Sequence, residues 1–92
     1  MDIVQPDSAG IERAVAALRT GEIVAYPTES VYGLGVDPFN AAAVENLFRV
    51  KFRGESNPVL MIIGEMEQLD LLAGDVSHTA SRFMDKFWPG PL

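Results

Sequence analysis

The run at positions 27–35 holds residue types that could bind an anion. The Thr28 hydroxyl and the backbone N–H groups near Gly33 and Gly35 could face a carboxylate or a phosphate. Glycine lets such a group approach the backbone closely because it has no Cβ. The structural alternative is that Thr28 only closes a turn where a strand ends and that Tyr32 fills the core. Both interpretations stay open at this point.

A second cluster, of cations, follows further along the chain. Three of the seven basic residues, Arg49, Lys51 and Arg53, fall within one short stretch. In an extended segment residues two apart point the same way, so Lys51 and Arg53 are expected to converge on one anion. The alternative is a solvated helix end whose cations offset the negative pole of the helix dipole.

Composition excludes several other kinds of chemistry. The chain has no cysteine and one histidine, so disulfides, thiolate catalysis and cysteine-bound zinc are ruled out. His78 is expected at the surface. The net charge of -6 argues against broad attraction to nucleic-acid backbones and favours a local cationic pocket for a small anion. No apolar run approaches the roughly 20 residues of a membrane span and no signal peptide is evident, which predicts a cytoplasmic protein without a membrane partner.

The elements that must position both clusters follow from hydrophobic spacing and capping residues. We expect a helix that Asp7 or Ser8 begins and Gly21 ends, and a second helix that Asn40 begins and that frays after Val50. The other expected elements are a strand at 23–26, a loop at 28–35, a strand at 59–63, and helices at 66–72 and 77–87.

This order of elements predicts an α/β fold with a twisted, open, mixed sheet and flanking helices. The apolar run 23–26 is continuous, as in strands covered on both faces, and 59–63 is the strongest strand candidate, expected at the centre of the sheet. Phe83, Phe87 and Trp88 are expected in the core or as an apolar platform. Because a Pro-Gly-Pro turn ordinarily introduces another element, we expect the domain to continue past Leu92.

Three strings in the sequence together resemble the YrdC-like family. GEIVAYPTESVYGLGVDPFN is similar to the opening signature of that family, LFRVKFRGESNPV to its Lys-x-Arg segment and the strand that follows, and FWPGPL to its Trp-Pro-Gly-Pro element. They occur in the usual order. The resemblance covers essentially all of the chain but about the first half of a family domain, so residues 1–92 are predicted to be the N-terminal portion of a single YrdC-like domain.

The resemblance implies an ATP-dependent nucleotidyltransferase of tRNA processing. Its substrates would be L-threonine, bicarbonate and ATP, with Mg²⁺ held by the ATP phosphates and no metal site made by the protein. Thr28 and Tyr32 would contact threonine, Lys51 and Arg53 would be the catalytic cations, and Arg53 and Asn57 would hold ATP. The product would be threonylcarbamoyl-adenylate, which serves threonylcarbamoyladenosine formation in tRNA.

Two positions depart from the family pattern, and other functions remain open. Gly54 stands where many members have proline, and Ile62 stands where some carry a histidine that contacts threonine. One alternative is a YrdC-like module that binds RNA weakly without catalysis, and another is an inactive fragment. The oligomeric state, and a family relative with other carbamoyl chemistry, are not distinguished by the sequence.

Overall fold

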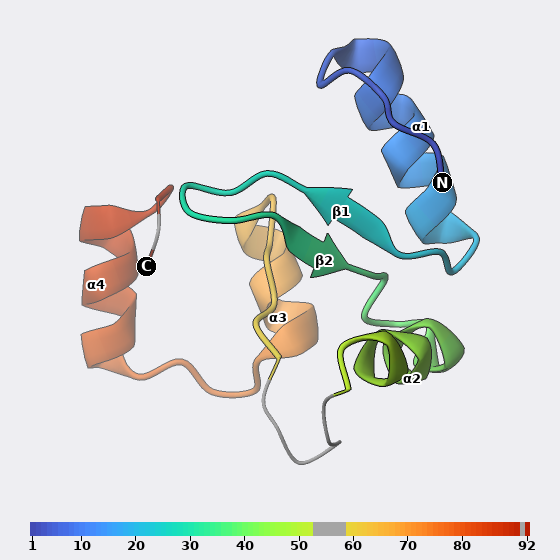
Figure 1. The fold of residues 1–92 in the computed structure, drawn as a ribbon. Coiled ribbons are helices and arrows are strands. Elements are labelled where there is room, and N and C mark those ends of the chain that lie inside the picture. The colour runs from blue at the N-terminus through green and yellow to red at the C-terminus, as the bar shows by residue number, and fades with distance from the viewer. Residues whose placement is uncertain (53–58, 91) are drawn as a thin grey trace. The chain divides into compact units, whose positions relative to one another are not determined.

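The computed structural model describes residues 1–52, 59–90 and 92. The chain divides into two compact units, Met1–Leu60 and Met61–Leu92. The first unit holds α1, β1, β2 and α2, and the second holds the short 3₁₀ helix η1 with α3 and α4 (Figure 1). No helix in these described ranges is both long and apolar enough to cross a membrane.

The helix α1 (Ser8–Arg19) is closed at both ends by local hydrogen bonds. At its start, the Gly10 N–H donates to Oδ1 of Asp7 at 2.8 Å, so Asp7 is the N-cap. At its end, Gly21 adopts a φ of 85°, and its N–H donates to the Leu18 carbonyl at 3.0 Å. This left-handed conformation favours glycine and stops the helix, as the sequence predicts.

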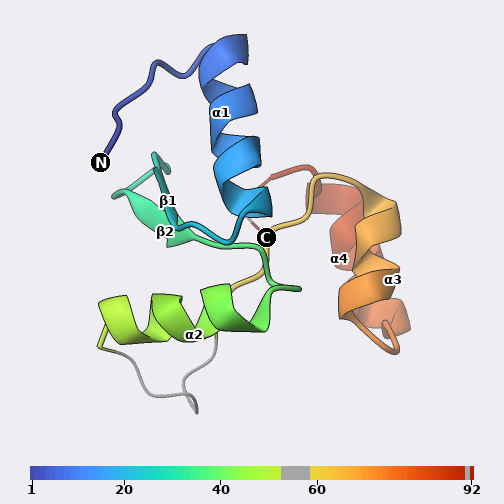
Figure 2. The same cartoon turned by 90° about the vertical axis from the view of Figure 1, so that its right-hand side faces the viewer.

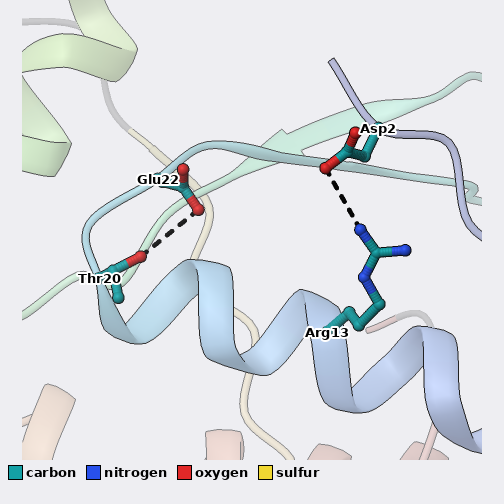
Figure 3. Close-up of polar contacts among 4 residues, drawn as sticks. All are labelled: Asp2, Arg13, Thr20 and Glu22. Carbon is teal, nitrogen blue, oxygen red and sulfur yellow. Dashed lines mark hydrogen bonds and ion pairs between the residues drawn. The ribbon is translucent and has the colours of Figure 1, made fainter.

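Polar contacts also tie flanking segments to α1 (Figure 3). Arg13 pairs with Asp2 at 3.2 Å, which holds the extended N-terminal segment near the helix. The Thr20 hydroxyl donates to the Ala17 carbonyl at 2.9 Å and lies 3.4 Å from a carboxylate oxygen of Glu22. Both side chains of the Asp2–Arg13 pair are exposed, so its contribution to stability is small, about 0–1 kcal/mol.

The strands β1 (Val24–Tyr26) and β2 (Gly33–Gly35) form an antiparallel hairpin. Val24 lies opposite Gly35, and Tyr26 lies opposite Gly33. The prediction of a loop throughout 28–35 is therefore wrong for its last three residues, which pair with β1. The expectation that both faces of β1 are covered is also wrong, since Ala25 is exposed.

The helix α2 (Ala41–Val50) carries the buried residues of the first unit's apolar core. Asn40 caps it, with Oδ1 accepting from the Ala43 N–H at 3.1 Å. Ala43 and Leu47, one helical turn apart, are 3% and 5% exposed. Figure 2 shows the short connection that leads from β2 into α2. The predicted start of this helix at Asn40 is confirmed.

The second unit is built from helices. The 3₁₀ helix η1 (Met66–Gln68) runs directly into α3 (Leu69–Leu72), and α4 (His78–Phe87) follows. Ser77 caps α4 by accepting from the Ala80 N–H at 3.1 Å. The two helices predicted at 66–72 and 77–87 are confirmed, and His78 is exposed as expected.

A central strand was predicted at 59–63. This prediction is wrong for the described structure, in which these residues form neither a helix nor a strand. Leu60 and Ile62 are 85% and 69% exposed. A strand is stabilised by backbone hydrogen bonds to a neighbouring strand, and the described sheet consists of β1 and β2 alone. The α/β class is confirmed, while the sheet of the described residues is two-stranded and antiparallel.

Candidate functional site

The hairpin connection at 27–32, here called the Thr28 loop, is folded around the Thr28 hydroxyl. Oγ1 of Thr28 accepts from the Ser30 N–H at 3.2 Å, lies 3.4 Å from Oγ of Ser30, and donates to the Val31 carbonyl. These bonds make a turn of the kind that threonine side chains favour. The hydroxyl therefore closes the turn while its residue stays exposed, and its contact with a ligand remains a prediction.

Tyr32 does not fill the core. Its residue is 73% exposed, and so is Val31 beside it on the same loop. The alternative interpretation of Tyr32 as a packing residue is therefore wrong. The Thr28 loop presents a hydroxyl and an aromatic ring on one exposed segment, which are the residue types expected at a small polar ligand.

The space over the two glycines of β2 is filled by the ring of Tyr26. A methyl group at Gly33 would lie 2.9 Å from Cζ of Tyr26, and one at Gly35 would lie 2.9 Å from Cε1 of the same ring. Non-bonded carbon atoms do not come this close, so a methyl group at either glycine would require the Tyr26 ring or the backbone to shift. These glycines were predicted to allow the close approach of a ligand, whereas in the structure they make room for the Tyr26 side chain.

Tyr26 is thus a residue that the sequence argument missed as part of the site. A signal for it was present, because an aromatic residue placed across a hairpin from a glycine can cover the bare backbone there. In this sequence the aromatic residue ends β1 and the Gly-x-Gly forms β2, with the Thr28 loop between them.

The cations at the end of α2 lie in different local environments. Arg49 pairs with Glu45 at 3.8 Å across one helical turn, and both side chains are largely exposed. Lys51 is the C-cap residue and is exposed, and Phe52 after it has a φ of 53°, outside the helical range. The helix thus ends at Val50, as predicted. An exposed lysine here is favourable for the helix dipole and is also accessible to an anion.

Two predicted site residues, Arg53 and Asn57, lie outside the described residues. The convergence of Lys51 and Arg53 on one anion therefore stays a prediction. Thr28, Tyr32 and Lys51 all belong to the first unit. Among the described residues, no hydrogen bond or ion pair joins Lys51 to the Thr28 loop.

Within the ranges that the structure describes, no three His, Cys, Asp or Glu side chains come together in a group that could hold a metal ion. The binding of ATP and Mg²⁺ stays a prediction.

A protein-family model matches most of the chain. The model of the Sua5/YciO/YrdC family, described as "Telomere recombination", matches residues 16–92. The matched segment contains the Thr28 loop, both strands of the hairpin and the cations around Lys51.

Curated relatives match nearly the whole chain. A threonylcarbamoyl-AMP synthase of Pyrococcus abyssi is 42% identical over 82 residues, which are 89% of this chain and 24% of the relative. A threonylcarbamoyl-AMP synthase of Bacillus subtilis is 40% identical over 91 residues, 99% of this chain and 26% of the relative. The chain therefore spans about a quarter of the length of these two proteins.

Two solved structures of Pyrococcus abyssi Sua5 share the fold. One is a variant with two substitutions, and the other is a complex with L-threonine. Each is 38% identical to this chain with a TM-score of 0.87. The matches cover 95% and 96% of this chain, and 27% and 26% of the solved chains.

Proposed function

The chain belongs to the Sua5/YciO/YrdC family, and from this premise we propose that it contributes to a threonylcarbamoyl-AMP synthase. The reaction joins L-threonine, bicarbonate and ATP into threonylcarbamoyl-adenylate and releases pyrophosphate. The amino group of threonine and bicarbonate form a carbamate with loss of water. An oxygen of the carbamate then displaces pyrophosphate from the α-phosphorus of ATP. The activated group serves the threonylcarbamoyladenosine modification of tRNA.

One observation carries this proposal more than any other. Relatives named threonylcarbamoyl-AMP synthase are 42% and 40% identical to this chain over most of its length. The similarity to a Sua5 structure complexed with L-threonine supports threonine in particular as a substrate. The assignment of residues 1–92 to the N-terminal portion of a single domain stays a prediction.

We assign threonine to the Thr28 loop. Thr28 and Tyr32 are both exposed on it, so neither needs to be uncovered before it meets a ligand. The oxygen of a hydroxyl group can accept two hydrogen bonds and its hydrogen can rotate between acceptors. Thr28 can therefore exchange its internal bond to Val31 for one to the substrate while the Ser30 N–H still holds it in place.

We assign the ATP phosphates to the cations that follow α2. Lys51 lies at the helix end with an exposed side chain, and Arg53 and Asn57 follow it in the sequence. Adenylation concentrates negative charge on the α-phosphate and on departing pyrophosphate. Fixed cations stabilise that charge without a protein nucleophile, which suits a chain without cysteine. Mg²⁺ bound to the ATP phosphates would neutralise part of the same charge.

The proposed activity also implies a place of action and partners. A synthase that consumes ATP and serves tRNA modification acts where tRNA, ATP and threonine are present, so we propose a cytoplasmic location. Contact with tRNA is not required for the adenylation step. Weak RNA binding is therefore an outcome to be measured and not a premise.

Two lysines at helix ends allow a matched test of the proposal. Lys51 caps α2, and Lys86 lies in the last turn of α4, so each supplies one positive charge to a helix terminus. The measurement is pyrophosphate release by the full-length protein with ATP, bicarbonate and L-threonine. We expect Lys51→Ala to lower kcat/KM about 100-fold, as for loss of one charge-stabilising group. We expect Lys86→Ala to stay within about twofold of the wild type.

Other results would count against the proposal in different ways. Equal small effects of both substitutions would show that Lys51 serves only the helix end. No threonine-dependent pyrophosphate release by the wild type would reject the synthase itself. Salt-sensitive RNA binding without turnover would then favour the RNA-binding module.

A further inference from the structure

We propose that Tyr26 is a positioning residue for threonine binding. Its ring lies across Gly33 and Gly35 and fixes the two strands that carry the Thr28 loop. This inference rests on the proposed function, because L-threonine is the ligand of that loop. Tyr26 itself is not placed in contact with the substrate.

The contact between the Tyr26 ring and the two glycines is tight. A methyl group at Gly33 would lie 2.9 Å from Cζ, 3.1 Å from Cε2 and 3.1 Å from Oη of Tyr26. At Gly35 the nearest ring atom, Cε1, would be at 2.9 Å. One ring therefore spans both glycines of β2, and a side chain at either position would require the ring or the strand to shift.

The contact also lies next to the Thr28 loop along the hairpin. Tyr26 and Gly33 are the paired residues nearest to the Thr28 loop, since β1 ends at one and β2 begins at the other. The loop is attached at both ends to this pair. A ring packed there limits how the two strand ends can move relative to each other, and hence how the loop can move.

The strand ends are close in sequence to the residues that orient the Thr28 hydroxyl. Thr28 lies two residues after Tyr26, and its hydroxyl donates to the carbonyl of Val31, two residues before Gly33. The turn that orients the hydroxyl is thus built from residues close to both members of the pair. A displaced ring is expected to change the orientation of the hydroxyl without removing it.

The contact between Tyr26 and Gly33 can be tested by asking whether Tyr26→Ala removes the effect of Gly33→Ala. Gly33→Ala should displace the Tyr26 ring, whereas in a Tyr26→Ala background the same methyl group meets no ring. The matched control is Gly74→Ala, because a methyl group at Gly74 would have no atom within 4 Å. All variants are made in the full-length protein and titrated calorimetrically with L-threonine.

The dissociation constants for L-threonine distinguish a role of the Tyr26 ring in positioning the Thr28 loop from independent effects of the two substitutions. Gly33→Ala and Tyr26→Ala should each weaken threonine binding about tenfold, and the double variant should be no weaker than either alone, within about twofold. Gly74→Ala should stay within about twofold of the wild type. Tyr26→Phe keeps the ring and should also stay within about twofold, which would exclude a role of the hydroxyl.

Kinetics give a readout that loss of folded protein would not produce. A mispositioned Thr28 loop should raise KM for threonine and leave kcat and KM for ATP nearly unchanged. A smaller folded fraction would instead lower the apparent kcat at constant KM. Melting temperatures of all variants, measured alongside, show whether each is folded at the assay temperature.

Defined results would overturn the proposal. If Gly33→Ala weakens binding by the same factor in both backgrounds, or if Tyr26→Ala binds threonine as tightly as the wild type, the ring does not position the loop. If Tyr26→Phe is as impaired as Tyr26→Ala, the hydroxyl and not the ring is responsible. A wild-type protein that binds no threonine would instead reject the proposed function.

Discussion

The apolar segment 59–63 is rich in residues that favour strands, whereas β2 of the hairpin is Gly-Leu-Gly, yet only the hairpin forms a sheet in the described structure. In the hairpin each strand finds its partner across a short loop, and the Tyr26 ring covers the glycines of the opposite strand. In the segment, Leu60 and Ile62 are exposed, and no strand pairs with them in the described structure.

This difference shows that apolar composition alone does not make a strand. A strand needs a neighbour for its backbone N–H and carbonyl groups, and a partner close in sequence costs little chain entropy to reach. The hairpin meets both requirements within one unit. Each of the next three predictions tests whether local contacts of this kind account for the observed structure.

The largest effect is expected from a β-branched residue in the hairpin. Gly33→Val places more atoms against the Tyr26 ring than Gly33→Ala does, although valine favours strands in general. We expect the free energy of unfolding to fall by roughly 1–3 kcal/mol, measured by urea denaturation. Gly74→Val is the control, with a change within about 0.5 kcal/mol. A Gly33→Val variant as stable as the wild type would mean that the ring–glycine contact is loose.

A smaller effect is expected at the helix that follows the hairpin. Asn40→Ala removes the side-chain acceptor of the Ala43 N–H at the start of α2, which should cost about 1 kcal/mol in the same measurement. Asn40→Asp keeps an acceptor oxygen and should restore most of the loss. If Asn40→Asp were as destabilising as Asn40→Ala, the cap would not be the cause.

The last prediction concerns hydrogen exchange in the segment 59–63 of the unsubstituted chain. In the 92-residue chain, amide hydrogens at 59–63 should exchange with solvent far faster than those of the paired strands, because they lack strand partners in the described structure. Hydrogen exchange followed by mass spectrometry measures both. Equal protection of the two regions would contradict the contrast drawn here.

Sequence reasoning succeeded where the determining contacts are close in sequence. Asp7, Asn40 and Ser77 cap their helices through bonds three residues away, and these helix starts were predicted. Gly21 ends α1 for the same kind of local reason. Such elements require only a short window of sequence.

It failed where a contact depends on a partner element. The strand at Gly33–Gly35 was missed because glycines carry no strand signal, and only pairing with β1 makes them a strand. The strand at 59–63 was predicted from composition, and composition does not supply a partner. At the candidate site, the ligand contact of Thr28 was predicted from its residue type and stays a prediction, whereas the contact of Tyr26 with Gly33 and Gly35 was missed because it forms only across the hairpin.

The central claim is that the Thr28 loop binds L-threonine, and one titration tests it most directly. L-Threonine is titrated calorimetrically into the full-length wild type and into Thr28→Val, which has a similar shape but lacks the hydroxyl. The account predicts measurable binding by the wild type and a dissociation constant about tenfold higher for Thr28→Val, the usual scale for loss of a hydrogen bond. Equal affinity of the two proteins, or no heat with the wild type, would contradict it.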